Sequence, residues 1–277
     1  MSRVCVFTSN QPRHVALLDA LVDAGHDVVA VIEPKTMLLP ESGVMREYWT
    51  RVRDAERVVF RDTSPMVCVP ALVLRPGELS RAPWLPAQAQ HLVVFSASYI
   101  TGALADAMIE KGAINLHVGI APEYRGSAPN AFAMADGRPD LIGAQVQRLS
   151  KGLDAGDILA EVRPGPEGDY FTRSMLAVNL GIAALVALLE TPEPWTPVCA
   201  NDRAQQLRYS RHSDFTEAVA AKILGVPVPP CPCCGSSAAP VFDGRCSLCH
   251  RAPLHKQCGR CWDHCLCNPH PLRGPIA

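Results

Sequence analysis

Three polar residues of types used in acyl transfer occur in two short segments of the sequence. Asn115 and His117 flank Leu116, and Asp154 follows downstream within Leu153-Asp154-Ala155-Gly156. An amide N–H can donate to a developing oxyanion, and an imidazole can manage the proton that leaves an attacking amine. Asp154 could orient the imidazole and stabilise its protonated form, or hold a water that relays the proton. The trio therefore fits transfer of a one-carbon acyl group without a metal or a covalent intermediate.

The spacing places Asn115 and His117 on one face of a predicted strand. Residues two apart on a strand point to the same side of the sheet, so the apolar residues between and beside them face the opposite side and the core. A rigid Pro-x-x-Arg-Gly segment, residues 122–126, follows directly, and Asp154 comes after one further helix and strand. Taken singly, each residue suits a turn or a satisfied polar group. Their combination favours a functional site.

The elements around the trio predict an α/β fold with a mostly parallel sheet. Residues 3–8 and 27–32 are short apolar runs of the kind found in buried strands, and the helix expected at 14–24 joins them into a β-α-β unit. Further strands are expected at residues 67–74, 92–95, 113–118, 142–149 and 158–163. Further helices are expected at residues 45–60, 100–111, 172–189 and 214–224.

The composition is that of a globular protein, with 48% apolar and 19% charged residues among 277. A net charge of -1 gives no argument for nucleic acid or a membrane surface as the main partner. The N-terminus lacks the order of a signal peptide, and the longest apolar helical run, residues 180–189, is shorter than the roughly 18 residues that span a bilayer. We therefore expect a cytoplasmic protein with no membrane partner. We divide it into a catalytic domain (1–190), a proline-rich crossing segment with a short helix and linker (191–230), and a Cys-rich module (231–277).

In the segments around Asn115, His117 and Asp154 the sequence resembles the formyltransferase family that uses 10-formyltetrahydrofolate. This family includes methionyl-tRNA formyltransferase, glycinamide ribonucleotide transformylase and the sugar N-formyltransferases. Its Asn-x-His, Pro-x-x-Arg-Gly and Leu-Asp-x-Gly blocks match residues 115–117, 122–126 and 153–156, within a resemblance that covers roughly residues 3–165. The resemblance implies a Rossmann-like sheet with the site at the carboxyl ends of its strands, and Asn115, His117 and Asp154 as the catalytic trio. It also implies that the folate pterin lies between two segments, made of Ser98, Tyr99, Ile100, Leu149, Ser150 and Lys151.

Departures from these relatives bear on the acceptor. The transformylase binds its substrate phosphate with a glycine-rich loop after the first strand, whereas residues 8–14 contain no glycine. The tRNA enzyme carries a basic C-terminal domain, whereas the chain beyond Thr191 is proline-rich and then Cys-rich, with too few basic residues for a tRNA clamp. We therefore favour formyl transfer to a small amine, such as an amino sugar, an amino acid or a natural-product amine. The alternatives are formylation of aminoacyl-tRNA, hydrolysis of 10-formyltetrahydrofolate, and a zinc-ribbon adaptor on a degenerate scaffold.

The final segment has the composition of a metal-binding module. Nine of the 12 cysteines lie between Cys231 and Cys267, which in a reducing compartment favours metal over disulfides. The spacing predicts two structural zinc ions, in sequential or in cross-braced pairing, bound by Cys231, Cys234, Cys246, Cys249, Cys258, Cys261, Cys265 and Cys267. Such a module could stabilise the chain, form a homodimer, or contact a carrier or partner protein.

Overall fold

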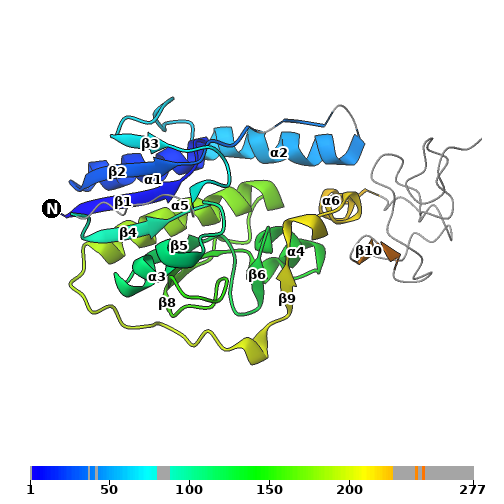
Figure 1. Cartoon of the computed structure of the whole chain (residues 1–277). Helices are drawn as coiled ribbons and strands as arrows, with labels where there is room; N and C mark the ends of the chain where they lie inside the picture. Colours follow the sequence, from blue (N-terminus) through cyan, green and yellow to red (C-terminus); the bar gives the residue numbers. More distant parts are fainter. Residues whose placement is uncertain are drawn as a thin grey trace, which may run out of the picture.

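The computed structural model describes residues 2–36, 38–40, 43–79 and 88–226, and the backbone of two short paired strands beyond them. A seven-stranded sheet in the order β3-β2-β1-β4-β5-β7-β8 forms the centre of the fold (Figure 1). The strands from β3 to β5 pair in parallel, and β7 pairs antiparallel with both β5 and β8. This confirms the predicted mostly parallel α/β sheet. The seven strands are β1 (Arg3–Thr8), β2 (Asp27–Ile32), β3 (Ala71–Val73), β4 (His91–Val94), β5 (Ile114–His117), β7 (Ala144–Arg148) and β8 (Ile158–Val162).

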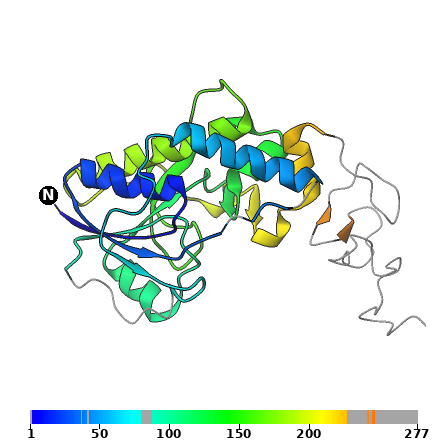
Figure 2. The ribbon, with the colours of Figure 1, turned by 90° about the horizontal axis from the view of Figure 1, so that it is seen from above.

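Helices cover both faces of the sheet. Seen from above, the blue α1 (Pro12–Asp23), the lighter blue α2 (Gly43–Val59) and the yellow-green α5 (Tyr170–Leu189) lie on one side (Figure 2). The teal α3 (Gly102–Glu110) lies on the other side. The remaining helical elements are α4 (Pro129–Ala135), α6 (Glu217–Leu224) and three short 3-10 turns, η2 (Pro139–Leu141), η3 (Arg203–Gln205) and η4 (His212–Asp214).

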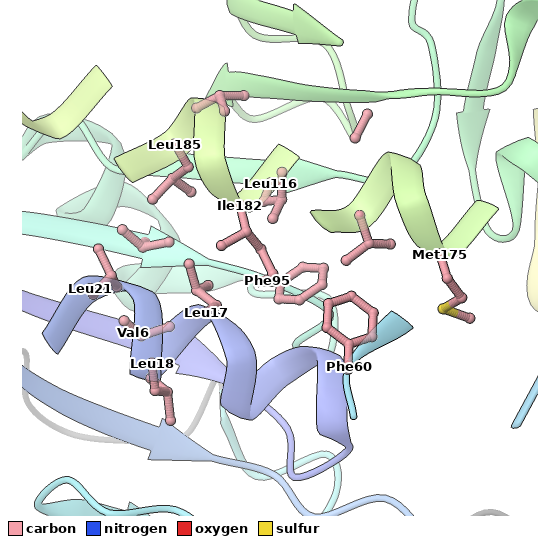
Figure 3. Packing of buried hydrophobic residues seen from close by; sticks show 14 of the residues in the cluster. Val6, Leu17, Leu18, Leu21, Phe60, Phe95, Leu116, Met175, Ile182 and Leu185 are labelled. Carbon is pink, nitrogen blue, oxygen red and sulfur yellow. The ribbon is translucent and has the colours of Figure 1, made fainter. Parts of the chain in front are cut away.

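Residues 4–7 of the strand β1 are all apolar because both faces of the strand are buried. Val4 and Val6 belong to the hydrophobic cluster beneath α1 and α5, whereas Cys5 and Phe7 belong to the cluster beneath α3. Figure 3 shows Val6 among side chains of α1, such as Leu17, and of α5, such as Ile182. This double burial explains the continuous apolar run, which lacks the alternation of a half-exposed strand.

The 20-residue helix α5 lies directly against the sheet. A Cβ atom at Gly181 would lie 2.8 Å from Leu116 Cδ1 and 2.9 Å from Ala144 Cβ, so only glycine allows this approach. Among the described residues, α5 is long and apolar enough to cross a bilayer by length and composition. The expectation based on residues 180–189 therefore underestimated this helix, whose buried face packs on β5, β7 and β8.

A second, two-stranded ribbon was not predicted. β6 (Tyr124–Gly126) comes from the Pro-x-x-Arg-Gly segment, and β9 (Arg208–Ser210) comes from the region expected to be a crossing segment. The two strands pair in parallel, with Gly126 opposite Ser210. Between α5 and β9 the chain runs along the sheet edge, where Trp195 is buried and Cys199 bridges to Ile158. Residues far downstream of the trio therefore contact the segment that follows it.

The predicted zinc ligands lie outside the described residues. Of the eight cysteines, Cys246 is described in its backbone alone, within β11 (Arg245–Cys246), which pairs with β10 (Val241–Phe242). In the described parts of the chain, no group of three or more His, Cys, Asp and Glu side chains is arranged to hold a metal ion. The eight are Cys231, Cys234, Cys246, Cys249, Cys258, Cys261, Cys265 and Cys267.

Candidate active site

A cavity of about 490 Å³ opens at the carboxyl ends of β4 and β5, and it contains the whole predicted trio. Asn115 and His117 come from the last residues of β5, and Asp154 comes from the turn between β7 and β8. Ile114 and Leu116 lie in the core cluster on the opposite face, as the strand spacing predicts. The volume lies within the range of about 300–1,000 Å³ that is typical of small-molecule sites.

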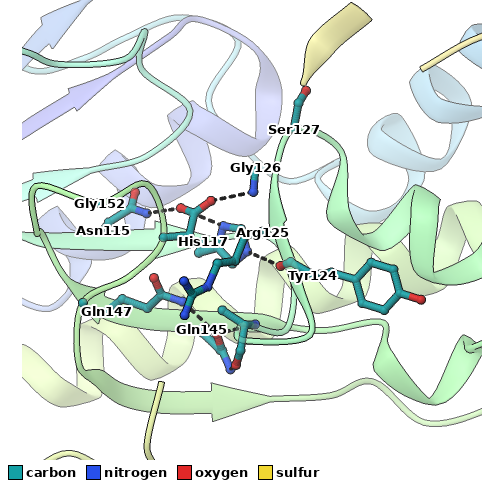
Figure 4. Close-up of polar contacts among 12 residues, drawn as sticks. Asn115, His117, Tyr124, Arg125, Gly126, Ser127, Gln145, Gln147 and Gly152 are labelled. Atoms are coloured by element: carbon teal, nitrogen blue, oxygen red, sulfur yellow. Dashed lines mark hydrogen bonds and ion pairs between the residues drawn. The ribbon is translucent and has the colours of Figure 1, made fainter. Parts of the chain in front are cut away.

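The carboxylate of Asp154 joins the members of the trio. Its Oδ1 lies 3.2 Å from His117 Nδ1 and 3.5 Å from Asn115 Nδ2. Its Oδ2 accepts a hydrogen bond of 2.9 Å from the backbone N–H of Gly126, in β6. Figure 4 shows Asn115, His117 and Gly126 converging from two elements on this one group.

The surroundings of His117 favour its protonated form. Its Nε2 lies 3.2 Å from the carbonyl oxygen of Tyr124, so both ring nitrogens face an acceptor. Burial by itself lowers the pKa of His117, but the charge and hydrogen bond of Asp154 outweigh it and raise the pKa above its usual value. Burial likewise raises the pKa of Asp154, but His117 and the Gly126 N–H together hold that pKa below its usual value. The two side chains, each 6% exposed, therefore stabilise each other's charged forms as a buried ion pair.

The turn that carries Asp154 depends on glycine. Asp154 has a φ of +48°, a left-handed conformation that short polar side chains tolerate better than most. A Cβ atom at Gly156 would lie 1.8 Å from the carbonyl oxygen of Arg148, so any other residue there would push the turn away from β7. In the Leu-Asp-x-Gly pattern, the glycine is thus required by the backbone conformation of the turn, and the aspartate supplies the carboxylate of the site.

Most of the residues expected to hold the pterin line the cavity. Its lining includes Ser98, Tyr99, Ile100, Leu149 and Ser150, whereas Lys151 does not line it. The side chain of Lys151 is 83% exposed and pairs with Asp106 at 3.3 Å, on the outside of α3. The structure therefore brings together five of the six predicted residues.

Sequence reasoning missed Glu33, which fixes one of these segments. Its Oε2 accepts from Ser98 N at 3.0 Å, and its Oε1 accepts from Gly77 N at 2.9 Å and Leu79 N at 3.1 Å. Burial alone raises the pKa of Glu33, but these hydrogen bonds, those of Ser98 foremost, hold the pKa below its usual value. A single acidic residue immediately after the apolar strand β2 is the signal that could have identified it.

Aromatic side chains from two helices also line the cavity. Tyr48 and Trp49 come from α2, and Tyr170 and Phe171 come from α5. The buried hydroxyls of Tyr48 and Tyr170 lie 3.2 Å apart. Because these helices are far apart in sequence, no local pattern marked them as a common wall.

Two cationic side chains also reach the cavity. Arg13 Nη1 pairs with the buried Glu56 at 2.7 Å, and Lys35 Nζ donates to the Ser96 carbonyl at 2.6 Å. Burial and the charge of Arg13 lower the pKa of Lys35, while Glu33 opposes them. The proximity of two positive charges gives this part of the cavity a preference for an anionic or polar group.

Residues 84–165, which contain the whole trio, match the profile of the family described as formyl transferase. The chain is similar to the methionyl-tRNA formyltransferase of Anaeromyxobacter dehalogenans strain 2CP-1, with 31% identity over 71% of this chain and 61% of that protein. It is also 31% identical to the methionyl-tRNA formyltransferase of Treponema pallidum strain Nichols, over 66% of this chain and 57% of that protein. The chain thus spans about three fifths of the length of these curated relatives.

Among solved structures, the fold is similar to a Mycobacterium tuberculosis protein to which sugar N-formyltransferase activity is attributed. The TM-score is 0.51 at 17% identity, and the match covers 78% of this chain and 77% of the other. At that identity the likeness concerns the fold alone. The profile match and the sequence relatives thus make residues 84–165 similar to formyl transferases, and the structural likeness shows a shared fold.

Proposed function

We propose that the protein transfers a formyl group from 10-formyltetrahydrofolate to the amine of a small acceptor. The observation that carries this proposal is the convergence of Asn115, His117 and Asp154 in the lining of one cavity. One end is formed by the segments that the family resemblance assigns to the pterin. The other end is formed by the aromatic side chains of α2 and α5, and it would receive the acceptor.

The folate end fits a flat heterocycle held by backbone groups. The Ser98 segment is fixed through its own N–H by Glu33, so its neighbouring backbone groups are positioned before any ligand arrives. Leu149 and Ile100 add apolar surface to the lining. A rigid, partly apolar slot lowers the entropy lost when a planar ring binds.

The roles of the trio follow from which of its hydrogen-bonding groups are available to a substrate. Asn115 is part-buried, and its amide has a single long contact, so Nδ2 can donate to the oxyanion that develops on the formyl oxygen. The imidazolium of His117 adds positive charge beside that oxyanion. The proton lost by the attacking neutral amine moves through water to the Asp154–His117 pair, which then returns it to the departing folate nitrogen.

The acceptor end supports a compact amine with a planar or apolar body. Trp49 and Phe171 offer flat apolar surface, while the paired hydroxyls of Tyr48 and Tyr170 offer a polar contact within it. Arg13, which is held by Glu56 of α2, would suit an acidic group on the same molecule. Formylation of an aminoacyl-tRNA is the second candidate, because the sequence relatives at 31% identity are methionyl-tRNA formyltransferases.

The test is a direct assay of formyl transfer. The protein is incubated with 10-formyltetrahydrofolate and, separately, with amino sugars, amino acids and charged initiator tRNA, while tetrahydrofolate release and product mass are followed. Release with a small amine supports the proposal, and release with tRNA alone supports the second candidate. Release without any acceptor indicates a hydrolase, and no release in any mixture would contradict formyl transfer. The Asn115→Ala variant is the matched inactive control.

We further propose that the Cys-rich segment binds two structural zinc ions. The support is the spacing of Cys-x-x-Cys pairs, and a module of this size has too little core to fold without metal. Plasma mass spectrometry of the purified chain should find two zinc ions per molecule. Loss of one ion in the Cys231→Ser variant, with formyl transfer retained, would separate this role from the chemistry. Size-exclusion chromatography of the same variant reports whether the module forms a homodimer.

A further inference from the structure

The turn that carries Asp154 is held by a residue almost fifty positions downstream. Asn201 Nδ2 donates to the Asp154 carbonyl at 3.1 Å and to the Gly156 carbonyl at 2.7 Å. The Asn201 side-chain N–H groups therefore donate to two backbone carbonyls of the turn, those of Asp154 and Gly156. Asn201 lies outside the region matched by the family profile, which ends at residue 165.

The backbone of the Asp154 turn needs support from its surroundings to keep its conformation. Asp154 is in a left-handed conformation that costs a non-glycine residue about 1–2 kcal/mol, and such a conformation persists only when the surroundings hold it. A displacement of about 1 Å in the backbone would break the 3.2 Å contact between Asp154 and His117, and misplacements of that size cost about 100-fold in rate.

Asn201 is itself fixed by Arg125, the arginine of the Pro-x-x-Arg-Gly segment. Arg125 is 1% exposed, and its Nη2 donates to the Asn201 carbonyl at 3.2 Å and to the Asn201 side-chain oxygen. Within the described residues, no carboxylate lies within ion-pair distance of Arg125. Its positive charge instead acts on Asp154, whose pKa it helps to lower.

The same downstream segment also holds the loop after the catalytic strand. Ser210 Oγ donates to the carbonyl of Ser127 at 2.6 Å, and the Ser127 N–H donates to the carbonyl of Ser210 at 2.8 Å. Gly126, between these contacts and Arg125, gives its N–H to Asp154 Oδ2. Asn201 thus fixes the main chain of Asp154, and Gly126 fixes its carboxylate.

We propose that Asn201 is a positioning residue of the active site, which with Arg125 holds the Asp154 carboxylate against His117. This role rests on the proposed formyl transfer for its catalytic meaning. Its physical content, the placement of one carboxylate beside one imidazole, can be measured without any substrate. Failure of the positioning role and failure of the proposed function are therefore distinguishable.

The experiment is a pH titration of His117 in the full chain, followed by NMR with ring-labelled histidine and assigned with His117→Asn. In the native protein the imidazole should titrate above the ordinary value, because Asp154 is beside it. In Asn201→Ala the turn loses both hydrogen bonds, the carboxylate moves away, and desolvation then shifts the titration downward. Formyl transfer, with the acceptor found above, should fall by about 10- to 100-fold in kcat with little change in KM.

The matched control is Leu207→Ala, on the same segment. The side chain of Leu207 is 57% exposed, so the change should leave both the titration and the turnover as in the native chain. Asn201→Ser retains one donor and should give an intermediate downward shift. A folded Asn201→Ala protein with the native His117 titration would overturn the proposal. Global unfolding of both Asn201 variants would overturn it too, since Asn201 would then support the whole fold rather than this turn.

Discussion

The ion pair between His117 and Asp154 makes the stability of the fold depend on pH in a specific way. The pKa of His117 is raised in the folded chain, so its stabilising contribution is complete below the unfolded value of about 6.5 and is lost as pH rises through the folded pKa. The pKa of Asp154 is lowered, so its contribution is present above about pH 3.9 and is lost as pH falls through the folded pKa. The pair therefore stabilises most between about pH 4 and pH 6.5.

Asp154→Asn removes the charge and keeps the size. At about pH 8 the imidazole can remain neutral, and the variant loses hydrogen bonding alone, at a cost of about 1–2 kcal/mol. At about pH 5 the buried imidazole must also give up its proton, which for a group that titrates near 6.5 adds about 2 kcal/mol. The expected loss at about pH 5 is then about 3–4 kcal/mol, similar to other cases in which one partner of a buried pair is removed.

Urea unfolding of the native chain and of Asp154→Asn at these two pH values checks this expectation. Asp62→Asn is the matched control, since that side chain is 91% exposed and its replacement should change the free energy of unfolding by less than about 0.5 kcal/mol at either pH. A loss for Asp154→Asn that is equal at both pH values, or larger at the higher one, would refute an imidazolium in the native site.

Three further outcomes follow from single contacts. Gly126→Ala places a Cβ atom 2.0 Å from the Ser210 carbonyl and should separate β6 from β9 with loss of formyl transfer, whereas Gly137→Ala, with a similar positive φ and nothing within 4 Å, should cost only about 1–2 kcal/mol in thermal unfolding. Glu33→Gln turns one acceptor into a donor that faces a backbone N–H, so folate affinity measured by calorimetry should fall about tenfold, while the exposed Glu47→Gln should leave it unchanged. Tyr48→Phe removes one hydroxyl of the Tyr48–Tyr170 pair at the acceptor end. This change should raise the KM of the acceptor and leave the KM of the folate unchanged. A change in the folate KM alone would show that the folate and acceptor ends are assigned the wrong way round.

The sequence allowed the parts of the fold with strong local patterns to be predicted. The bounds of β1 and β2 agree with the expected runs, because buried parallel strands are continuously apolar. The expected strand at residues 67–74 is reduced to Ala71–Val73, because this segment lies at the sheet edge and pairs on one side only. The expected helix at 214–224 begins at Glu217, after a 3-10 turn that ends at Asp214.

The parts of the site that were missed are made by long-range contacts. Asn115 and His117 could be placed on one face because strand geometry is local, and their role stays a prediction until the variants are measured. Asn201 gave no such signal, since its partners are 47 and 45 residues away in the sequence. The strands β6 and β9 have three residues each, too few to show a period. Function was thus easier to infer from the sequence than the means by which the site is held in place.

The pairing of β6 with β9 also has a consequence for protein synthesis. During synthesis the N-terminal part of the chain leaves the ribosome first, so β1 to β8 and the trio emerge before Asn201 and Ser210. A nascent chain that ends at Glu190 has all seven strands of the large sheet and lacks every residue that braces the Asp154 turn from downstream. The contacts that brace the Asp154 turn should therefore form late, when residues 201–210 leave the exit tunnel and β9 pairs with β6, and full activity should appear only at that point.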